Sequence, residues 1–230
     1  MDSSHYRRPS WRQPRWIIAA VAAGAFILIG VIVLATSGGT ASRPLAAKPA
    51  QGCRASVEDG AIPTAPPADV QWRNIGEVLS PVSATYGPAR YDGPVWECYA
   101  HNPTGAVLAA YDELAGLASP NWHIIAEHDV VPGQGQQAYI AASESQTYSA
   151  PPPGEILQAV GFEVLAYTPQ QATVETLAAA GTGQYQASEY TVAWYDGDWK
   201  MVLTPDGETG PDPQLVTSTD GFVLWGETDG

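Results

Sequence analysis

The chain has 230 residues, with 10 Lys and Arg against 24 Asp and Glu, and a formal net charge of −14 at pH 7. The two signs are separated along the sequence, because the part after Arg54 holds 23 acidic residues against three basic ones, a formal charge of −20. A surface this acidic repels phosphate backbones, so the composition argues against direct nucleic-acid binding by this part.

Residues 17–35, "IIAAVAAGAFILIGVIVLA", form an uninterrupted apolar stretch. As a helix this stretch would span about 28 Å, close to the thickness of the hydrocarbon core of a bilayer. Four arginines precede it and favour a cytoplasmic N-terminus. We therefore expect a single-pass cell-membrane protein, with a basic cytoplasmic tail at 1–16, a transmembrane helix at 17–35 in the lipid bilayer, and the rest extracytoplasmic. A cleaved signal peptide is the alternative, although its apolar core is usually shorter, about 7 to 15 residues.

Residues 36–69 are rich in Gly, Pro, Ala and Ser and have no sustained apolar period, which is typical of a stalk. Residues 70–204 are enough for one domain with a substantial core, and 205–230 are expected to form a C-terminal extension. Cys53 in the stalk and Cys98 in the domain are the only two cysteines. In an oxidising compartment a disulfide between them is the simplest expectation, and two buried free thiols are the alternative.

The first half of the domain carries signals for extended pieces and then a helix. "DVQWRNIGEVLSPVS" predicts a strand pair or an extended lead-in at 70–82 around Gly76. Asn102 as a cap and Pro103 in the first turn predict a helix. Its apolar residues recur at intervals of three and four positions as far as Ala118, so one face of the helix is expected to pack on the core.

Further elements follow on either side of this helix. "VWECYAH" at 95–101 indicates another short extended piece, and Ser119-Pro120 repeats the signal of a cap plus proline before a second helix at 121–131. A third, weaker helix is predicted at 135–145. Four strands are then predicted after Glu155, in "ILQAVGFEVLAYT", "ATVETLA", "QYQASEYTVAWY" and "DWKMVLT". Helices followed by hairpin-linked strands indicate an α+β domain, with about three helices on a curved antiparallel sheet.

The stretch "WYDGDWK" at 194–200 places two aspartates around a glycine, a pattern that can hold a metal ion or run acid/base chemistry. Asp196-Gly197 is also a preferred pair for a two-residue type I′ turn. If the pair forms that turn, Trp194 faces Trp199, and both are expected to point toward the helices. We therefore interpret the stretch as a hairpin rather than a metal site.

Other motifs match sites only loosely. Gly133, Gly135 and Ala138 fit the G-x-G-x-x-A pattern of dinucleotide sites, but a predicted helix rather than a strand precedes them, so a loop between helices is expected. His123 and His128 would lie about 140° apart on a helix, which disfavours a shared metal ion. No metal or cofactor site is therefore predicted.

No catalytic constellation is predicted either. An isomerase-like site would need an acid inside an apolar pocket, and the candidates for that acid are Asp112, Glu113 and Glu163. The first two lie beside the apolar stripe of the first helix. Glu163 lies between apolar residues of a predicted strand, and an outward orientation is an equally good expectation for it.

Four apolar residues follow the polar loop near the C-terminus, and they have two interpretations. They are Phe222, Val223, Leu224 and Trp225. They either fold back onto the domain or form a docking segment for a partner.

The tail, anchor and stalk, together with "NPTGAVLAA" at 102–110 and "WYDGDWK" at 194–200, carry a family resemblance. The chain resembles membrane proteins encoded on conjugative and integrative elements of GC-rich Gram-positive bacteria. The resemblance implies a cone-shaped nuclear transport factor two-like domain, as in the bitopic assembly subunit of type IV secretion systems. It implies a non-catalytic scaffold that contacts other membrane channel subunits and possible copies of itself. The alternatives are a small-ligand-binding or isomerase-like domain, and a membrane-tethered accessory protein of a lipid-import system.

Overall fold

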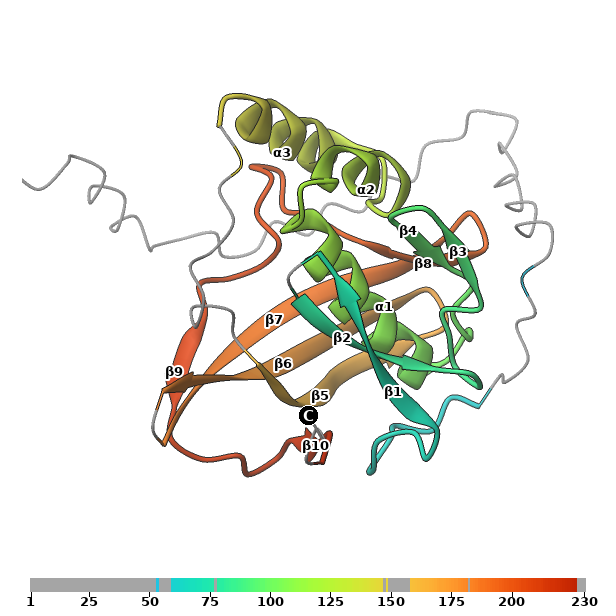
Figure 1. Cartoon of the computed structure of the whole chain (residues 1–230), viewed down its shortest axis with the longest axis vertical. Helices are drawn as coiled ribbons and strands as arrows, with labels where there is room; N and C mark the ends of the chain where they lie inside the picture. Colours follow the sequence, from blue (N-terminus) through green and yellow to red (C-terminus); the bar gives the residue numbers. More distant parts are fainter. Residues whose placement is uncertain are drawn as a thin grey trace, which may run out of the picture. The chain divides into compact units, whose positions relative to one another are not determined.

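Figure 1 shows the computed structural model of the chain, which describes residue 53 and residues 59–76, 78–146, 148, 158–181 and 183–226. The chain divides into two units after Pro44, and all described residues belong to the second unit. The predicted tail at 1–16, the predicted transmembrane helix at 17–35 and most of the predicted stalk lie outside the described residues. No helix within the described ranges is long and apolar enough to span a bilayer.

The domain is of the α+β class, which confirms the predicted class. Its described part contains three helices, α1 (Pro103–Leu117), α2 (Trp122–His128) and α3 (Gln134–Glu144). The main sheet is antiparallel with the order β10-β5-β6-β7-β8, and β9 also pairs with β7. Its strands are β5 (Ala159–Thr168), β6 (Gln171–Gly181), β7 (Gln184–Tyr195), β8 (Asp198–Met201), β9 (Gln214–Val216) and β10 (Val223–Leu224). Two separate hairpins pair β1 (Val70–Ile75) with β2 (Val78–Ser83) and β3 (Arg90–Asp92) with β4 (Val95–Glu97).

Helix α1 is the central element of the domain and lies between the β1–β2 hairpin and the main sheet (Figure 1). As predicted, Asn102 caps it, because its side chain accepts a hydrogen bond from the Gly105 backbone N–H at 2.8 Å. Its residues from Ala106 to Ala110 have no solvent exposure. Five consecutive apolar residues face all sides of a helix, so this part of α1 must be covered on all sides, which explains why α1 forms the middle layer.

The core lies between α1 and the inner face of the sheet, and its largest fully buried side chains include Trp199, Phe162 and Leu108. The β7–β8 hairpin has the predicted register, with Trp194 opposite Trp199. Both turn residues have positive φ, 53° at Asp196 and 86° at Gly197, as a type I′ turn requires. The prediction that the Asp-Gly pair is a turn is therefore confirmed.

Three local predictions were wrong. Helix α2 was predicted at 121–131 but ends at His128, because the residues after it bond to β8, where the Val131 backbone N–H donates to the Met201 carbonyl oxygen. The β3–β4 hairpin was missed, although its two-residue turn, Gly93-Pro94, begins with a glycine of positive φ. The third helix, predicted at 135–145, is confirmed as α3, but the stretch at 133–138 that was predicted as a loop forms its start. A Cβ on Gly135 would lie 2.5 Å from the Thr204 carbonyl oxygen. Only glycine allows this close approach.

Candidate functional site

Two adjacent acids on α1, Asp112 and Glu113, lie inside the protein, each only 4% exposed. Asp112 accepts hydrogen bonds from the Ser80 hydroxyl of β2 and from the Tyr99 hydroxyl, the latter at 2.6 Å. Burial raises the pKa of Asp112 to about 8, although these two hydrogen bonds act in the opposite direction. A large fraction of Asp112 is therefore protonated at neutral pH.

The carboxylate of Glu113 is hydrogen-bonded less completely than that of Asp112. Its Oε2 is one of two buried side-chain atoms in the described part of the chain without a hydrogen-bond partner. Burial, together with the nearby Asp129, raises the pKa of Glu113 well above its usual range. Burial also raises the pKa of Asp129 to about 7, although Lys200 counteracts it from 3.9 Å. These acids border a cavity of only about 10 Å³, which has room for one water molecule.

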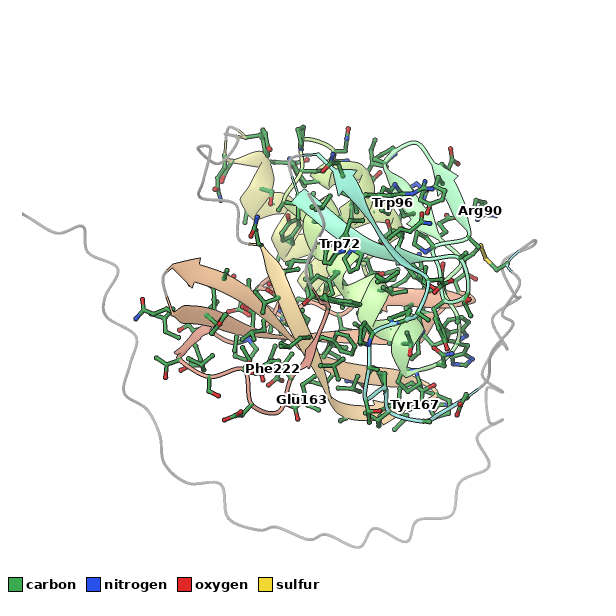
Figure 2. All side chains as sticks on the ribbon, turned by 60° about the horizontal axis from the view of Figure 1, so that its bottom comes forward. Trp72, Arg90, Trp96, Glu163, Tyr167 and Phe222 are labelled. Carbon is green, nitrogen blue, oxygen red and sulfur yellow. A yellow bond between two sulfur atoms is a disulfide. The ribbon has the colours of Figure 1, made fainter. Side chains whose placement is uncertain are left out.

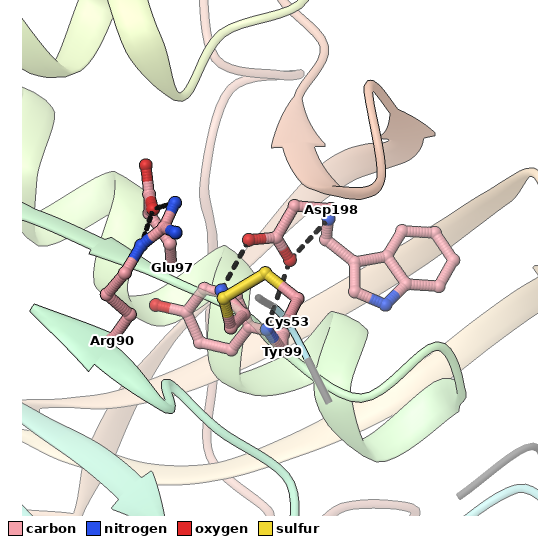
Figure 3. The surroundings of a disulfide bond; sticks show 7 residues. Cys53, Arg90, Glu97, Tyr99 and Asp198 are labelled. Carbon is pink, nitrogen blue, oxygen red and sulfur yellow. Dashed lines mark hydrogen bonds and ion pairs between the residues drawn. A yellow bond between two sulfur atoms is a disulfide. The ribbon is translucent and has the colours of Figure 1, made fainter. Parts of the chain in front are cut away.

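Asp198 binds the backbone segment that carries the disulfide (Figure 3). Its carboxylate accepts hydrogen bonds from the backbone N–H groups of Cys98 at 2.5 Å, Tyr99 at 3.1 Å and Trp199 at 3.0 Å. Cys98 has a φ of 70°, which a residue with a side chain rarely adopts, so these bonds hold a strained backbone. Burial raises the pKa of Asp198 to about 6. The sequence assigned both aspartates to the turn, but Asp198 has this further structural role.

The predicted disulfide between Cys53 and Cys98 is confirmed. It joins the predicted stalk to the buried segment that Asp198 holds. The alternative of two free thiols is wrong, because both cysteines are in the bond.

Within the described residues, no three His, Cys, Asp or Glu side chains converge so that they could hold a metal ion. His123 lies on the surface of α2, where its ring nitrogens are 3.7 Å from Glu127 and 3.9 Å from Glu144. Lys200 donates a hydrogen bond to the backbone carbonyl of His128.

Glu163 belongs to a row of acids on the outer face of the sheet, opposite to the face that buries Phe162. Glu175 of β6 is directly opposite Glu163 on one side and Glu189 of β7 on the other. Burial, and then these two neighbouring carboxylates, raise the pKa of Glu175. Figure 2 labels Glu163 next to Phe222 at the β5 edge. Glu163 therefore does not meet Asp112 and Glu113 in one site.

A second, larger cavity lies on the other side of α1, with a volume of about 210 Å³. The β1–β2 hairpin, α1 and the inner face of β5, β6 and β7 enclose it. Most of its lining is apolar, and the lining residues that carry a hydroxyl group are Tyr111, Tyr148, Thr176, Ser188 and Tyr190. None of the described residues that line it is charged. The cavity is not lined by Asp112, Glu113 or Glu163, the candidate acids for an apolar pocket.

The C-terminal apolar segment folds back onto the domain. Val223 and Leu224 form β10 and pair with β5, and Trp225 is 4% exposed. Trp225 packs against Phe162 and Tyr111, with ring centroids 4.6 Å and 5.5 Å away. Leu224 stays exposed, so docking through it is still a prediction.

The fold and these contacts define a disulfide-linked α+β domain with a polar, closely packed side and an apolar cavity. Residues 35–224 match the family described as domain of unknown function DUF8175, and the chain belongs to that family. No curated protein and no solved structure matches the chain. The matched range includes the two cavities described above, the disulfide and β10, so these features lie within the family's own domain.

Proposed function

We propose that the chain is a single-pass membrane protein whose extracytoplasmic domain is a non-catalytic assembly subunit of a conjugative DNA-transfer apparatus, a type IV secretion system. The observation that carries the proposal is the Cys53–Cys98 disulfide, which links the predicted stalk to the domain. Disulfides form and persist in oxidising compartments, so this bond supports a domain outside the cytoplasm. The apolar stretch at 17–35 supplies the membrane anchor.

The arrangement of the domain supports the family resemblance. Helix α1 packs on an antiparallel sheet, and the β1–β2 hairpin and α2 pack on α1, an arrangement of helices against a sheet that is also expected for a cone of the nuclear transport factor two-like type. Because one fold can host many functions, the fold alone does not identify conjugation, and the resemblance supplies that part of the proposal.

The buried acids do not face a cavity large enough for a substrate, and this supports a non-catalytic role. An isomerase-like mechanism needs an ionisable acid that faces a bound substrate. Asp112 and Glu113 instead border a space of about 10 Å³, which is too small for a substrate. The described lining of the large cavity offers no acid or base of this kind.

We assign the contacts with other channel subunits to exposed apolar side chains of β9 and β10. Leu215 of β9 is 68% exposed and Leu224 of β10 is 44% exposed. Single exposed apolar residues are ordinary on protein surfaces, so their role needs a direct test.

The test is deletion of the gene from its element, followed by complementation. Deletion should abolish or sharply reduce DNA transfer between cells, and the wild-type gene should restore it. Leu224→Asp should leave the amount of protein in the membrane unchanged and lower the transfer frequency. The matched control, Tyr195→Asp, changes an equally exposed residue at the β7–β8 turn and should not affect transfer. Unchanged transfer after deletion would rule out the proposal.

A further inference from the structure

We propose that the cavity of about 210 Å³ is a binding site for a small neutral ligand with an apolar body of one or two rings and a single hydroxyl or carbonyl group. This inference is independent of the assembly role, because it rests on the walls of the cavity and not on the membrane anchor or the disulfide.

The cavity exists because small side chains face each other across it. Ala115 and Ala118 of α1 lie on one side, and Ala159 of β5 and Ala178 of β6 lie on the other. Protein interiors are densely packed and contain few voids larger than a water molecule. A larger aliphatic side chain at any of these positions would fill the space, so the chain keeps room here that it does not keep beside Asp112.

Three of the hydroxyl-bearing residues of the cavity lie close together on its sheet side. Thr176 of β6 is directly opposite Ser188 of β7, and Tyr190 lies two residues further on the same face of β7. The Thr176 hydroxyl donates to the Ser188 carbonyl at 3.5 Å, and the Ser188 hydroxyl accepts from the Gln186 side-chain amide at 3.3 Å. Each hydroxyl can both donate and accept, so together they can bind one hydroxyl or carbonyl group of a ligand.

The lining also limits the charge and size of the ligand. No described lining residue is charged, and a charged ligand would lose its hydration without gaining an ionic partner. An engineered apolar cavity of about 150 Å³ in another protein binds benzene, so a cavity of this larger size can take a substituted ring or two fused rings.

A ligand can reach the cavity without unfolding of the domain. Leu79 of β2 and Tyr148 both line the cavity and are 42% and 39% exposed. The cavity therefore opens to solvent beside these two side chains.

The test uses the full chain in lipid nanodiscs, with methyl NMR signals of Ile75, Val78 and Leu114, which line the cavity. The probe is 2-naphthol, and 2-naphthoate is the charged probe of similar shape. Titration with 2-naphthol should shift these three signals and saturate, while the methyl signals of Ile125, buried on the other side of α1, should not move. The charged probe should cause no saturable shift.

Two variants locate the binding. Ala178→Leu places a larger side chain in the cavity and should raise the Kd of 2-naphthol at least tenfold. Thr176→Val removes a hydroxyl at constant size and should raise the Kd by about threefold to tenfold, the usual worth of one hydrogen bond. Unchanged signals of Ile125 in both variants would verify that the domain is folded.

The proposal is wrong if the shifts follow the lipid concentration instead of saturating, since that indicates partition into the bilayer. It is also wrong if Ala178→Leu binds as tightly as the wild type in a folded domain, or if 2-naphthoate binds as tightly as 2-naphthol.

Discussion

The two sides of helix α1 differ in packing, because one side borders a cavity and the other is closely packed. Tyr111, Leu114, Ala115 and Ala118 occupy positions i, i+3, i+4 and i+7, so they share one side of the helix. That side borders the large apolar cavity. Asp112, between them in sequence, points to the other side, where it is hydrogen-bonded and little space is left. Asp112 therefore connects α1 to β2 and to Tyr99, whereas the apolar side of α1 has room for another molecule.

The largest effect is expected where the C-terminal segment closes the apolar core. Trp225→Ala removes a buried ring that packs on Phe162 and Tyr111. It should lower the free energy of unfolding by about 3 to 5 kcal/mol. Leu224→Ala, at the exposed neighbour, should change it by less than about 0.5 kcal/mol. Urea unfolding of the two variants measures both values, and equal losses would mean that the segment does not pack as described.

The stability of the domain should be sensitive to loss of Asp198, which holds the backbone at Cys98 and Tyr99. Asp198→Ala removes an acceptor that serves three backbone N–H groups, including that of the strained Cys98. We expect a loss of about 3 kcal/mol, because buried donors are left without a partner. Asp196→Asn is the control, since asparagine also tolerates the positive φ of this exposed turn position. Chemical unfolding at pH 7 should therefore separate the two aspartates, and similar values for both would contradict the anchoring role.

The polar side should also make stability depend on pH. Burial raises the pKa of Asp198 to about 6, of Asp129 to about 7 and of Asp112 to about 8, all above the values of the unfolded chain. The folded state then binds more protons, so this stability is fully present below pH 4 and is lost as the pH rises toward 8. Each extra bound proton contributes a slope of about −1.4 kcal/mol per pH unit. Asp112→Asn should flatten the slope between pH 6 and pH 8, and a stability that rises over this range would contradict the described burial.

Side chains added on the two sides of α1 should have opposite effects. Ala178→Leu grows into the large cavity and should raise the free energy of unfolding by about 1 kcal/mol. Ala106→Leu adds the same atoms where the helix is fully buried without a cavity, and should lower it by about 1 to 3 kcal/mol. Thermal unfolding of the pair checks the contrast, which fails if both variants lose stability equally.

The smallest effect is expected on the outer face of the sheet. Glu175 lies between Glu163 and Glu189, and like charges directly opposite each other are unfavourable. Glu175→Gln should therefore stabilise the domain by about 0.5 kcal/mol at low salt, and less at high salt because ions screen the repulsion. Glu127→Gln on exposed α2 is the control. A gain that is independent of salt would indicate another cause.

Local rules predicted the parts of the fold that depend on neighbouring residues. The cap at Asn102, the turn at Asp196-Gly197 and the Trp194–Trp199 register each follow from a few consecutive residues. The disulfide could be predicted because the sequence has only two cysteines.

The candidate sites depend on contacts between distant segments, and these the sequence could not specify. Asp198 binds the backbone of Cys98, 100 positions away, and Asp112 binds Ser80, 32 positions away. Trp225 packs near Trp72, which lies close to the start of the domain in the sequence. The large cavity needs a hairpin, a helix and a sheet at once, so no short pattern in the sequence predicts it.

The most direct measurement of the difference between the two sides of α1 is a crystal structure of the full chain under xenon pressure, because xenon binds in apolar cavities. We expect xenon density between α1 and the sheet, beside Leu114, Ala115 and Ala178, and none beside Asp112. Side chains that fill the space next to Ala115, or xenon bound among the acids, would contradict the account.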